Sequence, residues 1–295
     1  MCFAVTAYID EYLTSHNAAL SERSIHTRIG PVIVTSLVSN LLGAVAIYFF
    51  SSSIELKTSL TIYAFLTGIP TMLVLIVYLY LLDSYSVPFV VPLFQLTSIW
   101  LLLFSFLMGE PITLLGCFGV IFIVAGAYAI DATKSAFKLP SRLLVVMAVN
   151  TLVWAVTLVS MTYLAKEAGG MLPIVFWQNV CAVLFGLVLY FCVSDYRKGL
   201  RMRILNQKRL FLSLSAVNEV FSQMGYVFKY MALAYAPVIA YGNTLSSLES
   251  GLVLIAFFLY PIRNESIKIH HVLGVVCIII GVAFVDFSLP RGLFG

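Results

Sequence analysis

Long apolar stretches follow one another along almost the whole chain, separated by short polar segments. A helix that crosses a bilayer needs roughly 20 mostly apolar residues. Windows of that length predict nine spans, at 31–50, 60–82, 86–108, 112–131, 143–165, 172–193, 209–233, 236–258 and 270–287. A tenth apolar stretch, residues 1–13, is too short to cross a bilayer and lacks the features of a signal peptide. The pattern predicts an all-α polytopic membrane protein.

The sequence contains an internal repeat. The pattern Glu-x8-Gly-x6-Gly-x4-Asp occurs once in residues 109–131 and again, with identical spacing, in residues 264–286. Such self-similarity is the signature of a duplicated module. Each copy holds five spans, and this odd number gives the two copies opposite orientations, as in many secondary transporters. We expect repeats at 1–131 and 143–287, joined by a linker at 132–142 and followed by a tail at 288–295.

The repeat also explains the short first helix. Met1 aligns with Leu152 of the second copy, whose first span begins near 143, so the first helix is about nine residues shorter than its counterpart. This indicates either a missing upstream segment or a half-length first helix. Ten helices, with a short first one, are therefore expected.

Composition supports the assignment to a membrane. Hydrophobic residues make up 61% of the chain and charged residues only 10%, and the mean hydropathy is +1.03. A soluble domain carries about 25% charged residues, so that class is excluded. The five cysteines lie in or beside apolar spans with no CxxC pair. Neither a disulfide framework nor a zinc site is expected.

Basic residues are distributed unequally between the two sides. When the stretch 1–13 is counted as the first span, the loops after odd-numbered spans hold 13 Lys and Arg residues, and the loops and tail on the opposite side hold three. The positive-inside rule then places the odd loops in the cytoplasm and both termini outside. The basic segment 197–209 anchors this topology, and nucleic-acid binding is not expected because the segment lacks interleaved aromatic residues.

Residues 92–130 resemble the end of an EamA module of the drug/metabolite transporter superfamily. The resemblance rests on a proline early in the span at 86–108, a Gly-Glu turn at 109–110, and glycines at 119 and 126. It implies ten helices in two inverted halves, and export or exchange of metabolites, amino acids or drugs. It also implies a multi-pass protein of the plasma membrane, the inner membrane in bacteria.

Two acidic residues fall deep within predicted spans. Glu219 and Glu249 each lie roughly 3 Å from the midplane of their helix, displaced toward the same side. Ionisable groups inside a bilayer are costly and usually functional. Along the helix that carries Glu219, one face is polar over its whole length: Asn218, Glu219, Ser222, Gln223, Gly225, Tyr226, Lys229 and Tyr230. That face is expected to line an aqueous cavity.

Further polar residues near the centres of other spans complete the candidate site. The residues predicted to bind substrate or a proton are Glu249, Glu219, Gln223, Asn218, Asn243, Ser246, Trp154, Asn150, Gln95, Asn40, Gln178 and Asn179. Weaker candidates are Asp10, Glu11 and Tyr226; the first two lie near the end of their helix, where solvation is cheap. The alternative for the amides and hydroxyls is hydrogen bonding between helices, and for Trp154 it is core packing.

The leading hypothesis is a secondary transporter that works by alternating access, with Glu249 and Glu219 binding a proton or a cationic group. No GxxxxGK[ST] loop is present to power primary transport. The alternatives are a membrane-embedded lipid- or prenyl-modifying enzyme and a channel or scaffold. No catalytic residue, metal or cofactor is expected. The expected partners are a small molecule and the lipid bilayer, and a homodimer is left open.

Overall fold

The computed structural model describes residues 2–15, 24–51, 54–85, 87–131, 141–235, 239 and 269–288. Over these ranges all regular structure is helical and no strand occurs. Contacts divide the chain into two compact units. Unit 1 comprises Met1, Val87–Val159 and Met231–Gly295, and unit 2 comprises Cys2–Ser86 and Ser160–Tyr230.

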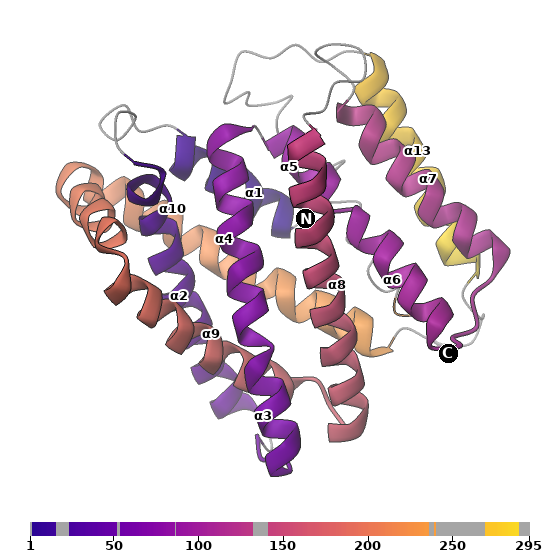
Figure 1. Cartoon of the computed structure of the whole chain (residues 1–295), viewed down its shortest axis with the longest axis horizontal. Coiled ribbons are helices and arrows are strands. Elements are labelled where there is room, and N and C mark those ends of the chain that lie inside the picture. The colour runs from indigo at the N-terminus through magenta and orange to yellow at the C-terminus, as the bar shows by residue number, and fades with distance from the viewer. Residues whose placement is uncertain are drawn as a thin grey trace. The chain divides into compact units, whose positions relative to one another are not determined.

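Unit 2 is built from helices that come from both ends of the sequence. They are α1 (Cys2–Ser15), α2 (Ile25–Phe50), α3 (Thr58–Leu66), α4 (Gly68–Ser84), the end of α8 (Ser141–Ala168), α9 (Leu172–Cys192) and most of α10 (Ser194–Tyr235). Helices α2, α3 and α4 all pack on α9, and α1 packs on α2 and α4. Their shared core includes Leu13, Ile33, Met72, Ala182 and Phe211. Figure 1 shows the course of these helices.

Unit 1 contains the remaining helices. They are α5 (Val87–Leu93), α6 (Leu96–Leu107), α7 (Leu114–Asp131), the first part of α8 and α13 (Ile269–Ser288). Helices α7 and α13 lie side by side over their length (Figure 1).

Glycines set the close approach of α7 and α13. A methyl group added at Gly119 would come within 2.7 Å of the carbonyl oxygen of Gly281, and one at Gly126 within 2.5 Å of that of Gly274. Small residues of this kind let helix backbones approach closely in a membrane. The pairs also run in opposite senses along the two helices, so α7 and α13 are antiparallel.

Within the described residues, four helical segments are long and apolar enough to cross a membrane. They are Ile25–Phe49, Thr58–Ser84, where α3 and α4 meet at Thr67, Leu143–Ala168 and Leu172–Cys192. Shorter apolar helices cover Leu96–Leu107, Leu114–Gly126 and Val276–Val285. The chain is thus a multi-pass membrane protein. The predicted span 236–258 lies almost wholly outside the described residues, and the number of ten spans stays a prediction.

Two elements differ from the expected spans. The expected span at 86–108 is interrupted at Phe94 and Gln95, just after Pro92. There the backbone amides of Thr97 and Ser98 donate to carbonyl oxygens three residues earlier, at 3.0 and 2.9 Å. A proline cannot donate a backbone hydrogen bond, so it weakens the turn that it occupies. Helix α10 begins at Ser194 rather than near 209 and is 42 residues long. Its basic first part contains good helix formers, which a search for apolar windows passes over.

Candidate functional site

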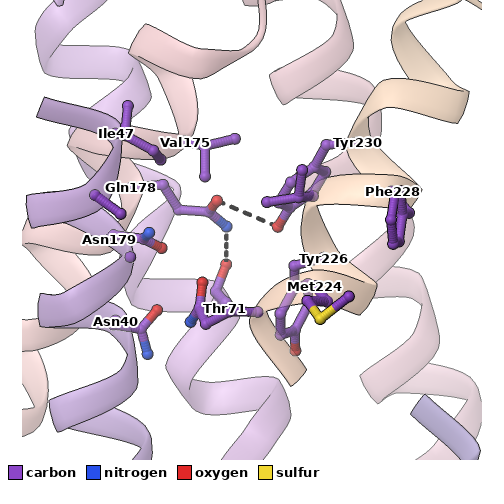
Figure 2. Close-up of a pocket in the computed structure, with 14 residues that line it drawn as sticks. Asn40, Ile47, Thr71, Val175, Gln178, Asn179, Met224, Tyr226, Phe228 and Tyr230 are labelled. Carbon is purple, nitrogen blue, oxygen red and sulfur yellow. Dashed lines mark hydrogen bonds between the residues drawn. The ribbon is translucent and has the colours of Figure 1, made fainter. Parts of the chain in front are cut away.

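A cavity of about 250 Å³ lies within unit 2, between α2, α4, α9 and α10 (Figure 2). The polar residues that line it are Asn40, Thr71, Gln178, Asn179, Gln223, Tyr226 and Tyr230. The other lining residues are Gly43, Ala46, Ile47, Val175, Met224, Val227 and Phe228. An apolar pocket with a few convergent polar groups is the usual form of a small-molecule site.

Gln178 on α9 organises one wall of the pocket. Its amide nitrogen donates to the Thr71 hydroxyl on α4 at 2.6 Å, and its amide oxygen accepts from the Tyr230 hydroxyl on α10 at 3.2 Å (Figure 2). Gln178 is only 1% exposed. Hydrogen bonds between side chains help to hold helices together at membrane depth. This residue therefore fixes three helices around the cavity.

Asn179 faces the cavity one position further along α9. Its side-chain nitrogen is buried and makes no hydrogen bond within the described part of the chain. Gly43 of α2 lies opposite, where an added methyl group would come within 3.0 Å of that nitrogen and 2.7 Å of Gln223 Oε1. A glycine at this position thus leaves room for the two amides. Buried polar groups are normally paired, so the unpaired amide nitrogen of Asn179 is a candidate group for binding a ligand.

Carboxyl groups cluster next to the pocket in the same unit. Asp10 on α1 is 3% exposed and accepts a hydrogen bond of 2.8 Å from the amide nitrogen of Asn218 on α10. The neighbouring Glu219 accepts a 3.4 Å bond from the Ser36 hydroxyl on α2. Asp10 and Glu219 are near enough for their charges to interact. We call Asp10, Asn218 and Glu219 the carboxyl cluster.

Helix α2 connects the carboxyl cluster to the pocket. Asn40 lines the pocket and donates to the carbonyl oxygen of Ser36 at 2.7 Å, while the Ser36 side chain bonds Glu219. On α10, Glu219 precedes Gln223 by one helical turn. The cluster and the pocket therefore share the helices α2 and α10.

The predicted site residues fall into three groups. Asn40, Gln178, Asn179, Gln223 and Tyr226 line the pocket. Asp10, Asn218 and Glu219 form the carboxyl cluster, and Glu11, which is fully buried on α1, follows Asp10 in the sequence. The burial of Asp10 and Glu11 differs from the solvated position expected for them. Glu249, Asn243 and Ser246 lie outside the described residues.

The third group belongs to unit 1. Gln95 lies in the interruption between α5 and α6 and is 4% exposed, while Asn150 and Trp154 are buried on α8. Beside them, the Trp100 indole nitrogen donates to the Thr151 hydroxyl at 3.3 Å. These residues belong to unit 1, whereas the pocket belongs to unit 2.

Sequence reasoning missed several residues of the site. Thr71 is a single hydroxyl within an apolar span, and Gly43 carries no chemical group, so neither gave a signal of its own. Ser36 and Ser39 bond the side chain and backbone of Glu219, respectively. They lie four and one residues before Asn40, and this helical spacing could have identified a polar face on α2.

Nothing in the described ranges indicates a metal centre. They contain no group of three His, Cys, Asp or Glu residues that could hold an ion. The cysteines described there, Cys117, Cys181, Cys192 and Cys277, are not in disulfides.

Charged groups gather at the end of unit 2 where α10 begins. Arg28 on α2 pairs with Asp83 on α4 at 2.6 Å, and Asp195 accepts bonds of 3.0 Å from both Lys198 and Ser24. These bonds, first from Lys198 and then from Ser24, lower the pKa of Asp195 below its ordinary value. Burial, with a contribution from the nearby Tyr80, raises the pKa of Tyr196 to about 12. These contacts join the ends of α2, α4 and α10.

Comparisons with known proteins agree with this architecture. Residues 142–286 match the model of the EamA-like transporter family. A crystal structure of another protein is similar with a TM-score of 0.62 at 12% sequence identity, covering 97% of this chain and 96% of the other. At that identity the likeness concerns the fold alone. No curated protein matches the sequence. Residues 142–286 therefore belong to the EamA-like transporter family, which is consistent with an EamA-type protein of the drug/metabolite transporter superfamily.

Proposed function

We propose that this protein is a secondary transporter, an exporter or exchanger, that carries a small metabolite, amino acid or drug by alternating access. The observation that carries the proposal is the pocket of unit 2, which is mostly apolar and contains converging amide and hydroxyl groups. Transporters of this general plan bind their substrate between helices. The family match supports transport as the class of activity.

We further propose that proton movement drives the transport through Glu219, together with Glu249. The support is the carboxyl cluster, in which Asp10 accepts a hydrogen bond from the neutral Asn218 amide and Glu219 accepts one from the neutral Ser36 hydroxyl. A carboxyl group held by neutral donors can take up and release a proton without breaking an ion pair. Asp10, on α1, would take part in the same uptake and release of a proton.

The proposal includes an orientation in the plasma membrane. The excess of basic residues in loops after odd-numbered spans supports a cytoplasmic position for those loops and an outside position for the termini. The charged end of unit 2, with Lys198 and the rest of the basic segment 197–209, then faces the cytoplasm.

The test is transport in proteoliposomes. An imposed pH gradient should drive uptake of one or more candidate metabolites into vesicles that contain the protein. Glu219→Gln and Glu249→Gln should each reduce this uptake by about tenfold or more, because the proton site is lost. Exchange of labelled for unlabelled substrate without a gradient should persist.

The control is Glu55→Gln, which removes an exposed carboxylate ahead of α3 and should leave the uptake unchanged. If a pH gradient drives no flux in the wild type, or if neither Glu219→Gln nor Glu249→Gln reduces the gradient-driven uptake, proton coupling is wrong. If no exchange of any candidate metabolite occurs, the transporter assignment itself is wrong.

A further inference from the structure

We propose that the pocket of unit 2 selects an uncharged molecule that has a flat apolar body and a hydrogen-bond acceptor of the amide or hydroxyl type. Organic cations and carboxylates are excluded on this view. The inference rests on the proposed function, because it takes the pocket to be the place where the transported molecule binds. It narrows the substrate class and separates the substrate site from the carboxyl cluster.

The first argument is charge. The pocket residues that the structure describes carry amides, hydroxyls and phenols, and none of them is charged. Glu219 lies one helical turn from Gln223 but bonds Ser36 and is not a lining residue. A charged ligand would lose its hydration without gaining a counterion there, and that loss is large in a low-dielectric site. A neutral ligand avoids this cost.

The second argument is the hydrogen bonding that the pocket supplies. The Asn179 side chain is 94% buried, since it is 6% exposed, and its nitrogen has no partner in the described structure. That nitrogen carries two N–H donors. It can be satisfied by a carbonyl or hydroxyl oxygen of the ligand. By contrast, Gln178 already makes hydrogen bonds with Thr71 and Tyr230, so its role is mainly structural.

The third argument is shape. The rings of Tyr226 and Tyr230 are stacked, with centroids 5.9 Å apart and planes inclined by 23° (Figure 2). Both line the pocket, as do Phe228 and Met224. Aromatic and thioether groups make favourable contacts with flat rings. The volume of about 250 Å³ is below the usual range of roughly 300–1,000 Å³ for ligand sites, so the ligand is small.

The test compares four probes of nearly equal size on the purified full chain in lipid nanodiscs. Benzamide is flat and neutral, benzoate is an anion, benzylammonium is a cation, and cyclohexanecarboxamide keeps the amide on a ring that is not flat. Equilibrium dialysis gives the dissociation constants. Benzamide should bind at least about tenfold more tightly than either charged probe, and cyclohexanecarboxamide should bind several-fold more weakly than benzamide.

Two variants connect this binding to the named residues. Asn179→Leu keeps the branched shape of the side chain but removes the donors, and it should weaken benzamide binding by about tenfold or more. Gly43→Ala removes no polar group but adds a methyl group that crowds the side chains of Gln223 and Asn179, so it should weaken binding too. The control Ser213→Ala alters an exposed hydroxyl elsewhere on α10 and should change nothing. Equal thermal midpoints of the variants exclude misfolding as the cause.

The outcomes separate this inference from the proposed function. Tighter binding of benzoate or benzylammonium, equal binding of all four probes, or no binding of any would overturn the inference. Labelled benzamide is then tested for counterflow in proteoliposomes. Selective binding of benzamide without counterflow of it or of any candidate metabolite would uphold the ligand class and contradict transport. Counterflow of charged metabolites that Asn179→Leu does not affect would uphold transport and contradict the ligand class.

Discussion

At the scale of single residues, Asp195 shows how one side chain fixes a helix end. It lies in the first turn of α10 and accepts hydrogen bonds from Lys198 and Ser24. A carboxylate in the first turn also interacts favourably with the helix dipole. The Ser24 bond joins the start of α10 to the start of α2, which are far apart in the sequence.

We expect Asp195→Asn to lower the thermal midpoint at pH 7. Because the pKa of Asp195 in the folded protein is below its ordinary value, its charge stabilises the fold at pH values above about 4. That contribution is lost as the pH falls through the folded-state pKa. The difference in midpoint between wild type and variant should therefore shrink between pH 7 and pH 2. A difference that stays constant with pH would contradict this reading.

The candidate site was only partly predictable from single residues. Amides in apolar spans stand out because they are costly there, and four of the predicted ones, Asn40, Gln178, Asn179 and Gln223, line the pocket. The position along its helix predicted a solvated Asp10, but Asp10 is buried and bonds the Asn218 amide of α10, 208 residues away in the sequence. Contacts of that kind are set by packing, which no single span reveals.

At the scale of elements, the contact between α7 and α13 depends on glycines. Gly119 and Gly281 lie against each other, and a methyl group at Gly281 would come within 2.6 Å of the Gly119 carbonyl oxygen. Backbone atoms cannot move away as the end of a flexible side chain can. The two helices must separate if either glycine is enlarged.

Gly281→Ala should therefore destabilise the protein by about 1–3 kcal/mol, the usual cost of overpacking. Unfolding of the protein in mixed micelles, followed by circular dichroism, measures this change. Gly170→Ala is the matched control, because an added methyl group there meets nothing within 4 Å. Equal destabilisation by the two substitutions would show that the close contact of α7 and α13 does not matter.

Helices were the most predictable elements, since apolar windows indicate them directly. Helix α9 occupies Leu172–Cys192, close to the expected span at 172–193. The ends of elements were less predictable. The helical start of α10 is polar, and the interruption at Phe94 and Gln95 depends on local backbone bonds that hydropathy does not report.

At the scale of the whole molecule, the pairing of α7 with α13 bears on the proposed inverted repeat. Gly119 aligns with Gly274 and Gly126 with Gly281 in sequence, yet in space Gly119 meets Gly281 and Gly126 meets Gly274. Such crossed contacts between equivalent positions are typical of a two-fold relationship. They support a duplication whose copies run in opposite directions.

The proposed orientation predicts which positions are accessible from each side. In a background with the five native cysteines replaced by serine, Arg201→Cys should react with a membrane-impermeant maleimide only after the cells are opened. Lys57→Cys should react in intact cells. Both side chains are exposed. Labelling of both from the same side would overturn the assignment of loops by charge.

The division into two units has a consequence for how the protein is made. Each unit combines segments from both sides of residues 132–142, so neither can be completed while the second half is still on the ribosome. Helix α7 ends at Asp131 and its partner α13 begins at Ile269. At 5–20 residues per second, α7 waits on the order of ten seconds for that partner. During biosynthesis its glycine face is therefore open to lipid, to other helices or to an insertion chaperone.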